Sequence, residues 1–411
     1  MRIEKARGCD GKGLMQSLTP LISALGIAQI ISWGSLFYAI GVLGPAMRAE
    51  LGVSELFLFG AFTAGLIVSG TLAPAAGRAI DRRGGRFVLS LGTVLAVVAM
   101  ALLAMAHSAW VMVLGWLVAG ASMAACLYDP AFATLSQHAG ARYRRAVTAL
   151  TLFGGFASTV FWPLSHLLLE AWGWRITFAI YAGMHLFICL PIHRLFVPKH
   201  SRITRGEEPA AEGAARLAPS ARLRWLTVSF ALATFVFGVI AVHLISLLTS
   251  AGLSAAQAVT ISMLVGPMQV AGRIIEYGFS GRVRAVTVGL VAFALMLLAL
   301  VALISVEGFG IAAIVFVVAY GCGNGVLTIV KGTAPAELFG RDGLGALLGH
   351  LSRAGLYAKA VAPASFSALL TFGLTRNGAL AALMAISVAG MGSYAMATRV
   401  RRAHAGDASP P

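Results

Sequence analysis

The chain has 411 residues, of which 59% are hydrophobic and 11% are charged, and its mean hydropathy is +0.86. Soluble domains have roughly 45 to 50% apolar and about 25% charged residues, so this composition excludes a soluble protein and indicates an integral membrane protein. The net charge of +16 would favour a nucleic-acid partner in a soluble protein, which makes the placement of the basic residues the next question.

Apolar runs of about 20 residues or more, each long enough to cross the roughly 30 Å hydrocarbon core as a helix, recur along nearly the whole chain. We predict twelve membrane-spanning helices from these runs. They cover residues 18–46, 57–78, 86–107, 110–137, 143–170, 174–197, 223–250, 256–279, 283–306, 309–336, 343–371 and 377–400. The first run is too long for a signal-peptide core of about 7 to 15 residues, so we keep it as a membrane helix.

Basic residues gather in alternate connections between these helices. They are Arg2, Lys5, Arg7, Lys12, Arg78, Arg82, Arg83, Arg86, Arg142, Arg144, Arg145, Arg282, Arg284, Arg399, Arg401 and Arg402. The other connections hold little beyond Arg48, Arg175 and Arg376. This positive-inside asymmetry predicts an inner (plasma) membrane protein with both termini in the cytoplasm. The basicity is therefore explained by topology, and we expect no nucleic-acid partner.

A long polar segment at residues 198–222 divides the chain into two sets of six helices. Its Pro, Gly, Ala and charged residues cannot bury a core, so we predict a flexible cytoplasmic linker. The predicted organisation is a cytoplasmic tail at 1–17, a six-helix bundle at 18–197, the linker at 198–222, a second six-helix bundle at 223–400 and a cytoplasmic tail at 401–411.

The two halves share short internal repeats. The matching residues are Gly155 and Pro163 with Gly355 and Pro363, 200 positions apart in both cases (355 − 155 and 363 − 163), and Gly77, Arg78 and Asp81 with Gly272, Arg273 and Glu276. Both offsets are close to half the chain length. Together with the central linker they predict duplicated six-helix halves.

Two basic residues lie in the middle portions of predicted membrane helices. Arg273 lies in VGPMQVAGRIIEYG and Lys359 in RAGLYAKAVAPASF. A cation in a membrane costs roughly 2.5 to 3.5 kcal/mol on insertion scales unless an anion meets it, so these residues suggest that the protein handles something negatively charged. The alternative is that either side chain extends to the cytoplasmic interface or pairs within the protein.

Residues 77–86, GRAIDRRGGR, resemble the loop signature G-x-x-x-D-R-x-G-x-R that the major facilitator superfamily carries between its second and third helices. The signature residues are Gly77, Asp81, Arg82, Gly84 and Arg86. The resemblance implies an all-α membrane protein with two pseudo-symmetric six-helix bundles, in which this loop latches the halves together in the outward-open state. The alternative is a solvated basic loop that only sets topology.

A narrower resemblance extends from ISWGSLFYAIGVLGP through this loop to GWRITF and on to the eleventh helix. These segments are similar to the branch that contains monocarboxylate transporters and oxalate/formate antiporters. The resemblance implies that Arg273 and Lys359 bind substrate carboxylates. Gln269, one turn before Arg273, departs from the aspartate that many monocarboxylate carriers have there, which puts their type of proton symport in doubt or shifts that role to Asp129.

Asp129 lies in the apolar fourth helix, where an acid is expected to be protonated or paired. Three roles remain open from the sequence: proton coupling, a structural pair with a cation of the other half that helps to gate the cavity, or exposure at the interface. Lys331 and Glu337 fall near the cytoplasmic end of the tenth helix, where extension to the interface or a gate contact is expected.

Several aromatic residues and one amide lie in helices expected to border a central cavity. The candidate substrate contacts among them are Tyr38, Tyr128, Trp162, Tyr320, Asn324 and Tyr357. Aromatic walls can shape a small site and hold a cation in place. Helix packing or an interfacial aromatic belt is the alternative for each aromatic, and helix packing for the GCGNG segment around Asn324.

The chain lacks the P-loop of an ATPase and the usual hydrolase motifs, and its cysteines lack metal-ligand spacing. We therefore predict no enzyme, no cofactor and no metal. The predicted function is secondary transport of a small organic anion, a mono- or dicarboxylate, by exchange for a counter-anion or by proton symport. The predicted partners are the substrate and the lipid bilayer, and the protein is expected to be a monomer. An efflux carrier for drugs or other toxic compounds is the alternative.

Overall fold

The computed structural model describes residues 10–199, 220–280 and 282–399, with side chains from residue 18 onward. The predicted C-terminal tail, most of the predicted linker and residues 1–9 of the predicted N-terminal tail lie outside the described residues. The first helix begins at Asp10 rather than at residue 18, and the second half begins with a helix at Ala221.

The described part of the first half is a succession of helices joined by short connections. It comprises α1 (Asp10–Trp33), the π-helical turn η1 (Gly34–Tyr38), α2 (Ala39–Leu51), α3 (Glu55–Arg83), α4 (Gly85–Ala104), α5 (Ala109–Cys126), α6 (Tyr128–His138), the 3₁₀ turn η2 (Gly140–Arg142), α7 (Tyr143–Gly155), α8 (Ala157–Met184), the π-helical turn η3 (His185–Cys189) and α9 (Leu190–Leu195). The second half comprises α11 (Ala221–Thr249), α12 (Ala255–Phe279), α13 (Ala285–Ile304), α14 (Ile311–Phe339), α15 (Leu344–Thr371) and α16 (Arg376–Arg399).

These helices account for the twelve predicted membrane crossings. Ten described stretches are long and apolar enough to cross a membrane. One of them, Gly140–Leu195, holds two crossings because Gly173, with φ 76°, breaks the helix within α8. The helix α15 is less apolar because it carries Arg353 and Lys359, and it supplies the remaining crossing. The all-α fold with twelve membrane helices is thus confirmed.

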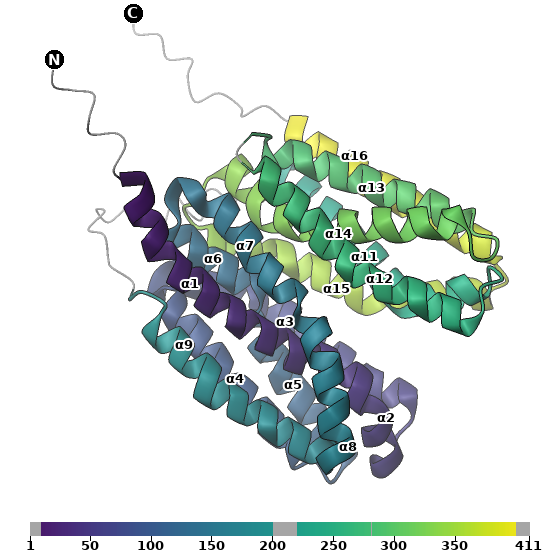
Figure 1. The fold of residues 1–411 in the computed structure, drawn as a ribbon, viewed down its shortest axis with the longest axis horizontal. Helices are drawn as coiled ribbons and strands as arrows, with labels where there is room; N and C mark the ends of the chain where they lie inside the picture. Colours follow the sequence, from purple (N-terminus) through teal and green to yellow (C-terminus); the bar gives the residue numbers. More distant parts are fainter. Residues whose placement is uncertain (1–9, 200–219, 281, 400–411) are drawn as a thin grey trace, which may run out of the picture.

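The two halves form two helix bundles that lie side by side, the first in purple to teal and the second in green to yellow (Figure 1). We call the end that carries connections 83–85, 138–143, 279–285 and 339–344 the basic end, after the arginines gathered there. One apolar core runs through the second bundle and continues into basic-end residues of the first, such as Ile80 and Val147. A separate core around Trp116 and Phe178 consists of buried residues of the first bundle, with Leu356 of α15 packed against it. The bundles are therefore joined by apolar packing at the basic end.

Glycines let α3 and α15 approach closely where the two bundles meet. A Cβ atom on Gly77 would lie 2.0 Å from the carbonyl oxygen of Gly345, and one on Gly349 would lie 2.3 Å from the carbonyl oxygen of Ala73. Real Cβ atoms do not approach backbone so closely, so a larger residue would force the two helices apart. The backbones of these two helices are in direct contact.

Candidate substrate cavity

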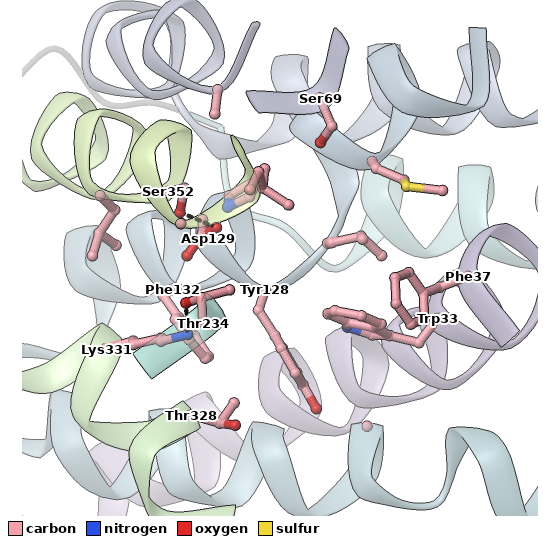
Figure 2. A pocket seen from close by; sticks show the side chains of 18 of the residues that line it. Trp33, Phe37, Ser69, Tyr128, Asp129, Phe132, Thr234, Thr328, Lys331 and Ser352 are labelled. Carbon is pink, nitrogen blue, oxygen red and sulfur yellow. Dashed lines mark hydrogen bonds between the residues drawn. The ribbon is translucent and has the colours of Figure 1, made fainter. Parts of the chain in front are cut away.

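A cavity of about 240 Å³ lies between the two bundles and is lined by residues of both halves. Its lining combines aromatic side chains with three cations, one carboxylate and several hydroxyl and amide groups. In Figure 2, Trp33 and Phe37 lie on one side of this pocket, and Asp129, Lys331 and Ser352 lie on the other. The volume is below the roughly 300 to 1,000 Å³ of pockets for drug-sized ligands, so the cavity as seen suits a small molecule.

Arg273 lines this cavity from α12 and is buried, with 3% of its surface exposed. It does not reach an interface. Its guanidinium donates to the carbonyl oxygens of Thr151 at 2.7 Å and Gly325 at 3.4 Å, and to Oε1 of Gln269 at 3.5 Å. A guanidinium has five N–H groups, of which three make these bonds, and the side chain of Tyr128 is a further hydrogen-bond partner, so the orientation of the guanidinium is fixed. Since Thr151 belongs to α7, Arg273 also joins the two halves.

Lys359 lines the cavity from α15, and its ammonium lies over aromatic rings. Its Nζ atom is 3.8 Å from the ring centroid of Phe37 and 5.0 Å from that of Phe237. Aromatic faces attract a cation but do not neutralise its charge. Among the residues that the structure describes, no carboxylate forms an ion pair with Lys359. The side chain is therefore a cation at the cavity wall without a carboxylate partner in the described chain.

The other six predicted substrate contacts divide between the cavity and its surroundings. Tyr38, Tyr128 and Asn324 line the cavity. The remaining three predicted contacts, Trp162, Tyr320 and Tyr357, are not part of its lining. Trp162 lies edge-on to Tyr38 at 6.3 Å, Tyr320 is buried against Phe316, and the Tyr357 hydroxyl hydrogen-bonds to Thr71 across the bundles at 2.8 Å. The structure thus brings half of this group together around the cavity.

Two π-helical turns support the aromatic side of the cavity. The turn η1 carries Phe37 and Tyr38, and Ser35 within it lies 2.8 Å from Nε2 of His185 in η3. Since the Ser35 hydroxyl donates to the carbonyl oxygen of Ile31, it accepts from His185, which must carry its proton on Nε2. Both side chains are fully buried. The sequence pattern gives no sign of either π turn, so this support could not be predicted.

Asp129 lies in the first turn of α6 and lines the cavity. Its Oδ2 accepts a hydrogen bond from the hydroxyl of Ser352 in α15, so the carboxylate joins the two halves. The partner is a hydroxyl rather than a cation, although Lys331 is close enough to attract it electrostatically. Because Asp129 lines the cavity, exposure at the membrane interface is excluded as its role. Proton coupling and a contact between the bundles remain as its candidate roles.

Lys331 is a cavity residue, although its place near the cytoplasmic end of the tenth helix predicts extension to the interface or a gate contact. It lines the pocket, and its Nζ donates to Oγ1 of Thr234 in α11 at 2.6 Å. Asn324, Thr328 and Lys331 follow one another at spacings of four and three along α14, which places them on one helix face. This periodicity, starting from the predicted contact Asn324, was the signal that could have identified Lys331.

The loop signature contributes a contact between the bundles at the basic end. The Asp81 carboxylate accepts hydrogen bonds from the backbone N–H groups of Gly345, at 3.0 Å, and Ala346, at 2.7 Å, in the first turn of α15. Gly84 adopts φ 79°, which permits the sharp turn into α4, and Arg86 donates to the carbonyl oxygen of Val197 in its own half. Arg82 is exposed. The signature therefore contributes a cross-bundle contact through Asp81.

A second contact joins the bundles at the basic end through Glu276 of α12. The buried Glu276 carboxylate accepts from Arg144, with an ion pair of 2.7 Å, and from the hydroxyl of Thr148 at 2.7 Å. Arg144 also donates to the carbonyl oxygen of Val283. Among the described residues, the hydrogen bonds that cross between the bundles lie at this end or at mid-depth. The basic end is therefore closed.

Sequence and structure comparisons agree on the family of the chain. Residues 25–363 match the Major Facilitator Superfamily. The chain is 30% identical over 193 residues to "Multidrug resistance protein MdtL" of Klebsiella pneumoniae strain 342, a stretch that covers 46% of this chain and 47% of that protein. The chain thus spans about half the length of the curated relatives it matches.

Solved transporter structures share the fold over nearly the whole chain. The human organic anion transporter MFSD10 (TETRAN) superposes with a TM-score of 0.70 at 16% identity, covering 91% of this chain and 99% of that one. The transporter FucP in the outward conformation superposes with a TM-score of 0.74 at 12% identity, covering 93% and 99%. At these identities the likeness shows the fold alone. With the match over residues 25–363, it establishes that this chain is a multi-pass membrane transporter, not an enzyme, and belongs to the Major Facilitator Superfamily.

Proposed function

We propose that this transporter moves a small organic anion, a mono- or dicarboxylate, across the inner membrane by alternating access. The observation that carries this proposal is the Lys359 ammonium, which lies on the cavity wall against Phe37 and Phe237 without a carboxylate partner among the described residues. A cation held in a membrane protein favours an anionic ligand, because the ligand replaces the hydration that the cation has lost. Arg273 supplies a second, rigidly held donor set in the same cavity.

The geometry supports a cycle in which the two bundles rock about the cavity. By the positive-inside asymmetry the basic end is cytoplasmic, so its closure corresponds to an outward-facing state. In this state an anion enters from outside and binds Lys359 and the guanidinium of Arg273. Because Arg273 also bonds to Thr151 of the other bundle, a ligand on this guanidinium lies at the boundary that must open.

Transport is driven by exchange or by protons, and the cavity supports a specific argument for each. Exchange follows if the cations destabilise the closed, empty carrier. The binding site then returns to its first orientation only when a second anion occupies it. Proton symport follows if Asp129 takes up the proton, since its carboxylate bridges the bundles through Ser352. The same assay separates the two, because exchange requires internal anion and symport responds to a pH gradient.

Efflux of drugs or other toxic compounds is a second candidate. It is favoured by the aromatic lining formed by Trp33, Phe37, Tyr38, Tyr128 and Phe132 and by the partial match to a multidrug resistance protein. Three cations in the lining disfavour cationic drugs but accept anionic ones. Anionic compounds of larger size would therefore be the substrates under this alternative.

The test is uptake of labelled oxalate, formate, lactate and pyruvate into proteoliposomes, with and without internal anion and a pH gradient. Wild type is compared with Arg273→Gln, Lys359→Gln and the matched control Arg145→Gln, since Arg145 is an exposed arginine outside the cavity. Saturable uptake that both cavity variants lose and the control retains supports the proposal. Absence of uptake of every acid by folded wild-type protein contradicts it and favours efflux of other compounds.

A further inference from the structure

Lys331 places a third cation in the central cavity. Its ammonium uses one of three N–H groups on Thr234, whose own hydroxyl proton is donated to the carbonyl oxygen of Phe230 at 2.6 Å. Thr234 is therefore a neutral acceptor for Lys331 and leaves the positive charge uncompensated. The two remaining N–H groups of the ammonium are available to a ligand.

Asp129 is the only carboxylate in the described lining, and it does not pair directly with Lys331. It attracts Lys331 electrostatically, yet no ion pair joins the two side chains in the described structure. Asp129 instead bonds to Ser352, and Figure 2 shows this pair beside Lys331 and Thr234 on the same side of the pocket. This carboxylate is directed to the bundle contact, so Lys331 keeps capacity for an acceptor from the ligand.

The charges of the lining do not balance. In their charged forms, Arg273, Lys331 and Lys359 contribute three positive charges and Asp129 contributes one negative charge, so the lining then carries 3 − 1 = +2. Lys331 also repels Lys359. Charges interact more strongly in a cavity walled by apolar helices than in water, so the excess favours a ligand of equal and opposite charge. A monocarboxylate neutralises half of the excess, and a dianion neutralises all of it.

We propose that the substrate is a dianion with two separated acidic groups, one held by Arg273 and Lys359 and the other by Lys331. This inference rests on the proposed function and names its substrate class. The cavity volume of about 240 Å³ suits a short dicarboxylate rather than a large polyanion. Thr234 positions the ammonium of Lys331, and an acidic group of the ligand takes its two free N–H groups.

The experiment measures binding to purified full-length protein in nanodiscs by isothermal titration calorimetry. The probes are malonate, succinate and glutarate, each compared with the monocarboxylate of the same carbon number: propionate, butyrate and valerate. We expect wild type to bind the best dicarboxylate at least tenfold more tightly than its monocarboxylate partner. Lys331→Gln should weaken dicarboxylate binding at least tenfold and change monocarboxylate binding less than threefold, whereas Lys359→Gln should weaken both.

Further variants keep the test decisive. Lys331→Arg retains the charge and should retain the preference for dicarboxylates, which allows the comparison even if Lys331→Gln fails to fold. Equal losses for both acids in Lys331→Gln, or loss of the preference in folded Lys331→Arg, would assign Lys331 a structural role and overturn the inference. Carboxylate binding that depends on Arg273 and Lys359 but not on Lys331 overturns it while the proposed function stands. No binding of any acid by wild type overturns both.

Discussion

Asp81 and Glu276 lie at corresponding places in the two halves, near the basic ends of α3 and α12, but they join the bundles by different means. Asp81 bonds to backbone N–H groups at the start of α15, where glycines bring the helix backbones into contact. Glu276 bonds to the side chains of Arg144 and Thr148 in α7. The acid is thus present at the corresponding place in both halves. The distance to the facing helix decides whether backbone N–H groups or side chains bond to it.

The difference predicts unequal responses to mutation. The α3–α15 contact depends on close backbone packing and on the N–H groups of a helix terminus, which carry a partial positive charge. The α7–α12 contact depends on a charge pair that is lost when either partner is removed. Each prediction is measured with spin labels on exposed Ala141 and Arg282, on the two sides of the basic end, by the fraction of molecules with a longer label separation.

The largest effect is expected from Arg144→Gln. Glu276 has 2% of its side chain exposed, so removing its cationic partner leaves a carboxylate buried in the closed state. Removing one member of a buried pair costs about 3 to 5 kcal/mol, and we expect about 3 kcal/mol here because Thr148 remains and Arg144 is partly exposed. The ratio of molecules with a longer label separation to molecules in the closed state should therefore rise about a hundredfold.

The double variant Arg144→Gln/Glu276→Gln separates a charge effect from a packing effect. Removal of both charges leaves no unpaired carboxylate, so the double variant should lie closer to wild type than Arg144→Gln does. Arg145→Gln, the change to the exposed neighbour, should leave the distribution unchanged. A double variant that is more open than the single variant would show that the charge pair is not what holds α7 to α12.

The next effect is expected from Gly77→Ala, which tests the close backbone contact. A Cβ atom there would lie 2.0 Å from a backbone carbonyl oxygen that cannot rotate away. Overpacking of this kind costs about 1 to 3 kcal/mol, and we expect the upper part of that range for the closed state. The matched control is Gly60→Ala in the same helix, where a Cβ would meet open space. Equal distributions for Gly77→Ala and wild type would contradict the assigned contact.

A smaller effect is expected from Asp81→Asn. The amide keeps one acceptor oxygen and loses the charge, so it gives up one of two charge-assisted bonds and the attraction of the helix terminus. We expect the closed state to lose about 1 to 2 kcal/mol, less than in Arg144→Gln. If Asp81→Asn opened the basic end more than Arg144→Gln does, the contact of Asp81 rather than that of Glu276 would contribute more to the closed state.

The acids of both contacts were identifiable from the sequence, but their partners were not. The repeat of Gly77 and Asp81 as Gly272 and Glu276 pairs the two positions, whereas Arg144 belongs to a basic connection 132 residues before Glu276, since 276 − 144 = 132. Apolar length predicted the membrane helices well, because a helix must span the hydrocarbon core. It could not predict the π turns, which depend on packing and buried hydrogen bonds such as Ser35 with His185.

The candidate cavity shows the same division. Arg273 and Lys359 stood out because charge is costly in an apolar run, and both line the cavity. Lys331 lies near a helix end, which predicts extension to the interface or a gate contact, although its spacing from Asn324 places both residues on the same helix face. Trp162, Tyr320 and Tyr357 were candidates by helix alone, and which way an aromatic side chain faces depends on neighbours far away in the sequence.

The smallest effect is expected from Arg82→Gln, although Arg82 is part of the loop signature. Asp81 next to it bonds across the bundles, whereas Arg82 is exposed and forms no hydrogen bond or ion pair within the described part of the chain. An exposed side chain without contacts contributes within about 0.5 kcal/mol, so the label separation should match wild type within error. If Arg82→Gln opened the basic end as much as Asp81→Asn, the arginine would have to act in the closed state through a contact beyond the described residues. Closure of the basic end would then depend on Arg82 as well as on Asp81 and the N-terminus of α15. The contrast between a backbone contact at Asp81 and a side-chain contact at Glu276 would no longer describe how the two halves are joined.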